Sequence, residues 1–244
     1  MPETLSVDET SGDRALLLSV ATRSFRDLAD YLHAVQQVPG IRGLRSHVIT
    51  SVAADGSSWR LDALGADAAR RLRQVARRPP ARLRRPDDLD RRLAVALSTD
   101  GRASATELSK RTGVSVNTAR RRLAQSFDSG WLTARCDIAR AVSGHEVAAT
   151  FWVRVPPGDL ATSAGRITRL PQIRLVVTVT GPYNLVVTVW LRRPADVPAF
   201  ETEMVRLAPT IRVGERAVTL RPVKHLGRML DAHGRAEAVV PFDI

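Results

Sequence analysis

Three short amphipathic helices are predicted between residues 86 and 135, where apolar positions recur at helical spacing. The first helix begins near Asp87 and Asp88 and ends at Asp100-Gly101. Its apolar positions fall at i, i+4 and i+8, so one stripe can face a small core. These positions are Leu89, Leu93 and Leu97.

The second helix has the sequence signature of a capped start. Ser104 is followed three residues later by Glu107, and in such a capping box each side chain bonds a backbone N–H that the first turn leaves unpaired. Leu108 is its inward anchor. Gly113 lies in the turn that follows, where glycine can adopt the positive φ that often ends a helix.

The third helix, capped by Ser115, is predicted to have a polar outer face. Apolar residues recur every four positions at Ala119, Leu123 and Phe127, and the polar residues between them then point outward. The first turns of such a helix fit the major groove of DNA, where Asn117, Thr118 and Arg121 would reach base edges. Arg122 and Arg92 are better placed for phosphates. The full set of expected DNA contacts is Ser115, Asn117, Thr118, Arg120, Arg121, Arg122, Gln125, Arg92 and Arg102.

Strand and helix patterns alternate after the third helix, over residues 146–226. Strands are predicted at 147–155, 173–180, 183–191 and 211–223, with helices near 160–170 and 196–207, the second capped by Asp196. The order βαββαβ is that of a ferredoxin-like sandwich, with both helices on one face of an antiparallel sheet. The other face would be open to a partner sheet. We therefore expect a dimer or higher oligomer through this domain, or an internal pairing of the domain with the half-repeat near the N-terminus that is described below.

A partial internal repeat precedes the helical region. Residues 12–20 match residues 181–189 in pattern at an offset of 169. After a one-residue gap the match continues, with Pro39, Ile41, Arg42 and Val48 falling on Pro209, Ile211, Arg212 and Val218. Residues 12–64 are thus predicted to be a βαβ half-domain of the same sandwich. Without its first strand, this half must pair its own strands directly or borrow a sheet edge from elsewhere.

The fold class predicted for the whole chain is α+β: a winged or plain helix-turn-helix domain and a ferredoxin-like sandwich, preceded by the half-repeat. The remaining segments are expected to be a disordered tail over 1–11, a short helix and an Arg- and Pro-rich linker over 65–85, and a C-terminal tail over 227–244.

Positive charge is concentrated on the helical region. The formal net charge is +12, and residues 77–135 alone hold 14 basic and 6 acidic residues. Such a concentration attracts the phosphate backbone of nucleic acid. The apolar runs are only strand-length, which excludes a membrane span, and the N-terminus lacks the pattern of a signal peptide. These features favour a cytoplasmic protein, in which the single Cys136 is a small apolar residue.

No pattern in the chain indicates catalysis or a cofactor. The five histidines are scattered without metal-ligand spacing: His33, His47, His145, His225 and His233. No Ser-His-Asp set, paired carboxylates or phosphate-binding loop stands out. We therefore predict no enzymatic activity, no metal site and no cofactor.

Short motifs at the turns and helix ends of both predicted domains form a distinctive set: Leu89-Asp90-Arg91-Arg92, Asp100-Gly101-Arg102, Glu107-Leu108, Gly113-Val114-Ser115, Arg120-Arg121-Arg122-Leu123, Ser129-Gly130 and Thr180-Gly181-Pro182-Tyr183-Asn184. Over residues 86–226 the chain thus resembles the leucine-responsive regulator (Lrp/AsnC) family. The resemblance implies a helix-turn-helix that binds DNA, joined to a ferredoxin-like domain that dimerises and binds small effectors, often amino acids.

The effector site implied by the resemblance is the loop Thr180, Gly181, Pro182, Tyr183 and Asn184. Many members have Asp in place of Asn184, so a contact to an effector's ammonium group would be weaker here. The alternative is a tight β-turn at a dimer interface. The family also includes longer chains with two units in tandem, and this chain looks like one with an incomplete first copy.

The function predicted from the sequence is a DNA-binding transcriptional regulator that responds to a small effector and forms homo-oligomers. Two alternatives remain. A related group of sirohaem decarboxylases has the same two-domain layout, and a sensor or scaffold without DNA binding would also fit it. An Arg-rich third helix in a solvated bundle without a DNA partner is the corresponding alternative for the helical region.

Overall fold

Residues 147–225 form the four strands and two helices predicted for the ferredoxin-like domain. This computed structural model describes residues 1–57, 67–68, 71 and 85–242, so the helix and linker predicted over 65–85 lie almost entirely outside the described residues. The elements are β4 (Val147–Arg154), α7 (Leu160–Ile167), β5 (Ile173–Val179), β6 (Leu185–Leu191), α8 (Asp196–Leu207) and β7 (Arg212–His225). Their strands pair antiparallel in the order β7-β4-β6-β5, as in a ferredoxin-like sheet. We call this part the C-terminal unit.

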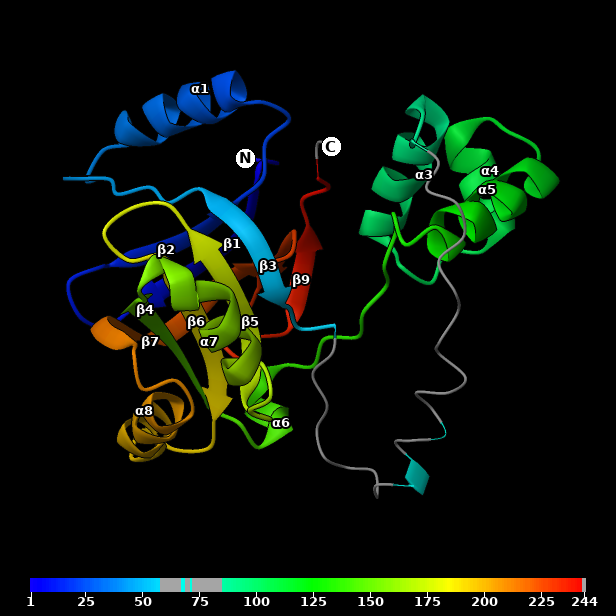
Figure 1. The fold of residues 1–244 in the computed structure, drawn as a ribbon. Helices are drawn as coiled ribbons and strands as arrows, with labels where there is room; N and C mark the ends of the chain where they lie inside the picture. Colours follow the sequence, from blue (N-terminus) through cyan, green and yellow to red (C-terminus); the bar gives the residue numbers. More distant parts are fainter. Residues whose placement is uncertain (58–66, 69–70, 72–84, 243–244) are drawn as a thin grey trace.

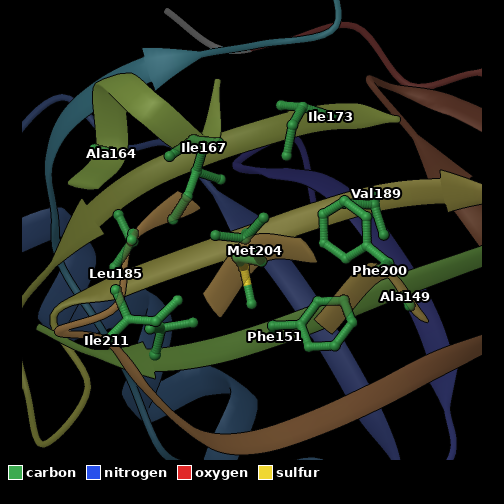
Figure 2. Close-up of a cluster of buried hydrophobic side chains, with 14 of the residues drawn as sticks. Ala149, Phe151, Ala164, Ile167, Ile173, Leu185, Val189, Phe200, Met204 and Ile211 are labelled. Atoms are coloured by element: carbon green, nitrogen blue, oxygen red, sulfur yellow. The ribbon is translucent and has the colours of Figure 1, made fainter. Parts of the chain in front are cut away.

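The core of the C-terminal unit lies between its sheet and its two helices. Alternate residues of β4 point toward the helices, and the rings of Phe151 and Phe200 of α8 lie 5.5 Å apart (Figure 2). Ile167 of α7 and Met204 of α8 are fully buried beside them. Burying one such side chain stabilises a fold by about 1.5–3 kcal/mol. Asp196 is the first residue of α8 rather than its cap, and its carboxylate accepts a bond from the Arg193 backbone N–H.

The reader domain, residues 86–135, consists of three helices: α3 (Asp88–Thr99), α4 (Ala105–Thr112) and α5 (Val116–Asp128). They enclose a small core of Leu93, Leu108 and Ala119, none of which is more than 1% exposed. The structure describes every residue from 86 to 135, and none of them forms a strand. This domain therefore has no β-wing. The short α6 (Arg140–Ser143) connects it to β4.

The N-terminal unit comprises β1 (Thr4–Thr10), β2 (Leu16–Val20), α1 (Phe25–Gln36) and β3 (Ile49–Ala54). The strand-helix-strand predicted for 12–64 is therefore present, but the disordered tail predicted for 1–11 is wrong. Residues 4–10 form β1, whose backbone pairs with β2 on one side and β7 on the other. The C-terminal 227–244 segment likewise contains two short strands, β8 (Arg228–Leu230) and β9 (Ala236–Val239).

The two units share one sheet, in the order β2-β1-β7-β4-β6-β5-β3 (Figure 1). The N-terminal unit thus borrows both edges of the C-terminal unit, with β1 on β7 and β3 on β5. The sheet face opposite the helices, which we expected to be open, is covered: Trp152 is only 2% exposed. The Arg14 guanidinium lies 4.6 Å from the Trp152 ring centre, and Arg174 lies 4.1 Å from that of Trp190.

The two units repeat one another strand by strand. Thr4 and Ile173 open β1 and β5 at an offset of 169, and Thr10 and Val179 close them at the same offset. The hairpin β1–β2 has the register Val7↔Leu18, and β5–β6 has Val176↔Val187; all five recorded pairs correspond at this offset. The inward residues of α1, Tyr31 and Val35, likewise match Phe200 and Met204 of α8.

The contacts between the units are reciprocal. β1 pairs with β7 through Thr10↔Thr219, and β3 pairs with β5 through Ile49↔Val179; the other three recorded pairs of each interface correspond in the same way. Side chains follow the same rule, because Val48 N–H donates to Thr180 Oγ1 (3.0 Å) and Val218 N–H donates to Ser11 Oγ (2.9 Å). A contact that is exchanged in this way is the signature of two-fold symmetry. The two units therefore form an internal pseudo-dimer, in which the N-terminal unit has no counterpart of β4 and α7 among the described residues.

Candidate nucleic-acid interface and effector site

Local sequence signals position α5 as predicted. Ser104 and Glu107 form the expected capping box at the start of α4, and Gly113 ends that helix at a φ of +74°. Ser115 caps α5 by accepting a bond from the Thr118 backbone N–H. A capping box at Asp87 and Asp90, which we did not predict, opens α3. The two-helix turn is therefore fixed by bonds between residues three positions apart.

The outer face of α5 is polar and exposed, as expected for a helix that enters a DNA groove. Thr118 is half-buried, with its hydroxyl bonded to that of Ser115. Arg120 and Arg121 form no ion pair with any residue that the structure describes. The predicted contacts that are exposed on α5 and its neighbours are Ser115, Asn117, Arg120, Arg121, Gln125, Arg92 and Arg102.

Arg122 is half-buried and paired within the reader domain, a placement that does not favour its predicted role as a phosphate contact, which stays a prediction. Its side chain is 22% exposed, and its guanidinium pairs with Asp87 (2.8 Å) and with Asp90 (3.5 Å) of α3. Asp90 is 1% exposed, and its other carboxylate oxygen accepts from the Asp87 backbone N–H. Arg122 therefore ties α5 to the start of α3.

Phe127 is also placed differently from the prediction, because it is 40% exposed while Ser126 is buried. At 3.6 residues per turn, each four-residue step rotates a side chain by about 40° around the helix axis. Phe127 therefore lies about 80° around the axis from Ala119, whereas Ser126 lies only about 20° from Ala119. The inward stripe of α5 therefore runs through Ala119, Leu123 and Ser126.

The loop Thr180–Asn184, predicted to hold an effector, is closed by the chain itself. The Asn184 side chain accepts from Val155 N–H (2.9 Å) and donates to Val155 C=O (2.8 Å), so both of its functions are used. Gly181 has a φ of +113°, and a Cβ there would lie 2.8 Å from His47 Nδ1. The close approach that requires glycine is therefore made by the N-terminal unit.

Pro182 and Tyr183 of the loop also have contacts within the protein. Arg154 Nε donates to the carbonyl of Pro182 (3.1 Å). The Tyr183 ring covers Gly214, where a Cβ would lie 2.1 Å from its Cε1 atom. The loop therefore has several contacts within the protein, although Thr180, Gly181 and Pro182 keep exposed surface.

A pocket lies instead at the corresponding loop of the N-terminal unit. Its volume is about 220 Å³, and it is lined by residues 11–14, by 214–217 of β7 and by Trp152. Arg14 donates to Glu215 from Nε (2.9 Å) and from Nη2 (2.5 Å), and Arg45 pairs with the other carboxylate oxygen (3.1 Å). Burial favours protonation of Glu215, but the bond from Arg14 outweighs it and lowers the pKa of the carboxyl. The offset of 169 from Gly181 to Gly12 was the available sequence signal for this pocket.

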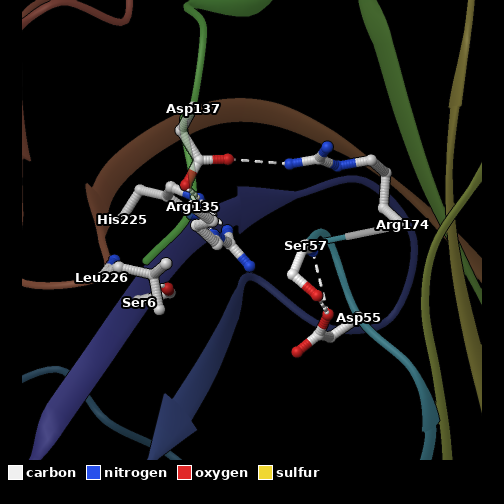
Figure 3. A network of polar contacts seen from close by, with 8 residues as sticks. All are labelled: Ser6, Asp55, Ser57, Arg135, Asp137, Arg174, His225 and Leu226. Atoms are coloured by element: carbon white, nitrogen blue, oxygen red, sulfur yellow. Dashed lines mark hydrogen bonds and ion pairs between the residues drawn. The ribbon is translucent and has the colours of Figure 1, made fainter. Parts of the chain in front are cut away.

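A polar network joins the end of the reader domain and the residues just after it to the N-terminal and C-terminal units (Figure 3). Asp137 pairs with Arg135 (2.7 Å), with Arg174 of β5 (2.9 Å) and with His225 of β7 (3.6 Å). Burial alone would raise the pKa of Asp137, but the bonds from His225 and Arg135 lower it well below its usual range. A Cβ on Gly56, just after β3, would lie within about 3 Å of both guanidinium groups. We did not predict this network, because its members lie far apart in the chain.

Among the described residues, no helix is long and apolar enough to cross a lipid bilayer. In the same part of the chain, no cluster of three or more histidine, cysteine or acidic side chains could hold a metal ion. Cys136 is exposed.

Comparisons with known proteins match both halves of this layout. Residues 87–125 match the AsnC-type helix-turn-helix domain. The HTH-type transcriptional regulator FL11 of Pyrococcus abyssi is 28% identical over 115 residues, which are 47% of this chain and 76% of that protein. The chain is thus similar to AsnC-type transcriptional regulators.

Solved structures of Lrp/AsnC proteins share the fold. AsnC of E. coli aligns with a TM-score of 0.50 and 23% identity over 57% of this chain and 94% of its own. The transcriptional regulator NMB0573 of Neisseria meningitidis, solved as an L-Met complex, aligns with a TM-score of 0.51 and 19% identity over 58% and 94% of the two chains. These alignments support the helix-turn-helix and ferredoxin-like architecture.

Proposed function

We propose that this protein is a transcriptional regulator of the Lrp/AsnC family that binds double-stranded DNA through α5 and responds to a small-molecule effector bound by its paired sensor units. The observation that carries the proposal is the exposed polar face of a capped α5, with Asn117, Arg120 and Arg121 unobstructed at its surface. A DNA-binding role also supports the cytoplasmic location predicted from the sequence.

The affinity for random-sequence duplex DNA, measured at several salt concentrations, tests the DNA-binding part. The logarithm of the affinity is expected to fall linearly with the logarithm of salt concentration, because each phosphate contact releases counterions. Arg92→Ala and Arg120→Ala are each expected to reduce the slope by about 0.9. Phe127→Ser, at an exposed apolar position, is the control expected to keep the wild-type slope. Absence of binding at low salt would contradict the proposal.

We place the effector in the pocket at residues 11–14, rather than at Thr180–Asn184. The pocket has space for a small molecule, and its lining includes residues of both signs, Asp13 and Glu215 with Arg14. Such a lining suits a zwitterion such as an amino acid or a related metabolite. The binding loop predicted at Thr180–Asn184 is retained as the competing site.

Calorimetry with a panel of amino acids and neutral analogues distinguishes the two loops. Gly12 and Gly181 both have positive φ, +82° and +113°, so tryptophan at either position carries a similar backbone strain. Gly12→Trp is expected to weaken binding at least tenfold, and Gly181→Trp to leave it within about twofold, in proteins that retain the wild-type circular dichroism. The reverse result would return the effector to Thr180–Asn184.

The homo-oligomer predicted from the sequence stays a prediction, as does the absence of catalysis. Internal pairing occupies both edges of the C-terminal unit's sheet, so self-association would have to use other surfaces. We further propose that the two units arose as a tandem repeat, on the basis of their shared registers.

A further inference from the structure

The pseudo-two-fold symmetry relates the pocket to a second position between the two units. Residues 11–14, which line the pocket, correspond to 180–183 at the offset of 169. Residues 214–217 on its other side correspond to 44–47, at the offset of 170 that separates β3 from β7. The matching backbone bonds are those from Ser11 N–H to the Val218 carbonyl and from Thr180 N–H to the Val48 carbonyl, both 2.9 Å. A fully symmetric pair of units would therefore have a second pocket between 180–183 and 44–47, which we call the second position.

One side chain fills the second position. His47 corresponds to Ala217, whose side chain in the pocket is a single methyl group. The His47 ring lies against the loop: its Nδ1 is 2.7 Å from the Thr180 carbonyl oxygen, and its Nε2 is buried. A Cβ on Gly181 would lie 2.8 Å from Nδ1, whereas the nearest atom to a Cβ on Gly12 would be 3.5 Å away. The space that is open beside Gly12 is therefore occupied beside Gly181.

The second position also lacks the carboxylates of the pocket. Pro182 corresponds to Asp13, and Arg45 corresponds to Glu215. The Arg45 guanidinium itself lies 3.1 Å from Glu215, so it contributes to the pocket instead. The ammonium group of a zwitterion is bound best by a carboxylate, through a charge-assisted hydrogen bond. The second position thus offers neither the space nor the acidic partner that the pocket offers.

We propose that the two units together bind one effector rather than two, and that His47 is the side chain that closes the second position. This proposal rests on the effector site proposed above and deepens it. The pocket is lined by residues 11–14 of the N-terminal unit and 214–217 of the C-terminal unit, so one bound molecule contacts both units. A single binding event per chain therefore acts on the whole pseudo-dimer.

Equilibrium dialysis of the full-length protein against a mixture of the common amino acids, followed by amino-acid analysis of the bound fraction, measures the stoichiometry. Wild type is expected to hold one molecule per chain at saturation. Ala217→His places the closing side chain in the pocket and is expected to weaken binding by about tenfold or more, because overfilling a packed site is unfavourable by at least this factor. Ala217→Ser, which adds one heavy atom at the same position, is the matched control and is expected to keep the wild-type stoichiometry.

Thermal unfolding tests closure by His47 without any effector. Gly181→Ala is expected to lower the thermal midpoint more than Gly12→Ala, because its new Cβ meets the His47 ring in addition to the strain of a positive φ that both variants share. In a His47→Ala background this excess is expected to disappear, since the ring that the Cβ would meet is gone.

The outcomes separate this proposal from the proposed effector site. Two bound molecules per wild-type chain would overturn the proposal, as would unchanged binding by a folded Ala217→His protein. An excess effect of Gly181→Ala that persists without the His47 ring would show that another group closes the second position. If wild type binds no amino acid but the excess disappears as expected, the effector site fails while closure by His47 is supported.

Discussion

Arg122 shows how one side chain changes the interpretation of a basic helix. Three consecutive arginines on α5 could all serve as phosphate contacts if only their type is considered. Arg122 instead lies on the inner side, where Asp90 is almost fully buried. A buried carboxylate requires a partner, and Arg122 supplies it. Of the three, Arg120 and Arg121 are the exposed side chains.

Arg122→Ala is expected to destabilise the protein by about 3 kcal/mol, because it leaves Asp90 buried without its cation. Arg120→Ala, at an exposed neighbouring position, is expected to change stability by less than about 0.5 kcal/mol. Urea unfolding monitored by circular dichroism measures both. Equal stability of the two variants would show that the Arg122–Asp90 pair is not structural.

At the scale of elements, the helices of the reader domain were predictable because their signals are local. Ser104 with Glu107, and Gly113, fix their own helix ends through bonds within a few residues. The inner face of α5 was predicted less well, because the partner of Arg122 lies on another helix. The pocket at residues 11–14 and the network around Asp137 depend on contacts between distant segments, which no local pattern reports.

β1 is the clearest case of an element formed by its surroundings. Its sequence, Thr-Leu-Ser-Val-Asp-Glu-Thr, is too polar to indicate a buried strand, and it shares little with the Val-rich β5 at the same offset. Its place is set by β2 and β7, which bond both of its edges. Tertiary pairing can override a weak intrinsic preference for strand.

Hydrogen exchange of residues 4–10 tests the ordered N-terminus. Because β1 lies between two strands, its amides are expected to exchange far more slowly than those of a free chain, with protection similar to that of β7. Exchange at the rate of an unfolded peptide would restore the original prediction of a disordered tail.

At the scale of the whole molecule, the network around Asp137 links three parts of the protein. The end of the reader domain contributes Arg135, and Asp137 follows it in the chain. The C-terminal unit contributes Arg174 and His225, and the N-terminal unit approaches through Gly56. A shift between the two sensor units would therefore move the attachment of the reader domain. This is the route by which we expect an effector to influence DNA binding.

Asp137→Asn is expected to lower the free energy of unfolding by about 2 kcal/mol at pH 7, since bonds to a charged group are lost. The pKa of Asp137 is lower in the folded protein than in the unfolded chain. Its contribution is therefore complete above pH of about 4 and is lost as the pH falls further. Urea unfolding at pH 7 and pH 3 is expected to show a smaller difference between wild type and variant at pH 3; a larger one would contradict this role.

Binding-site selection from random DNA, run with wild type and Arg121→Ala at two salt concentrations, tests the central claim that α5 recognises DNA sequence. Arg121 lies on the exposed face of the helix. Wild type is expected to enrich one motif, and Arg121→Ala to relax preference at one position of it, at a cost of about 1–3 kcal/mol. If both proteins bind every sequence equally and equally weakly, α5 does not recognise DNA sequence.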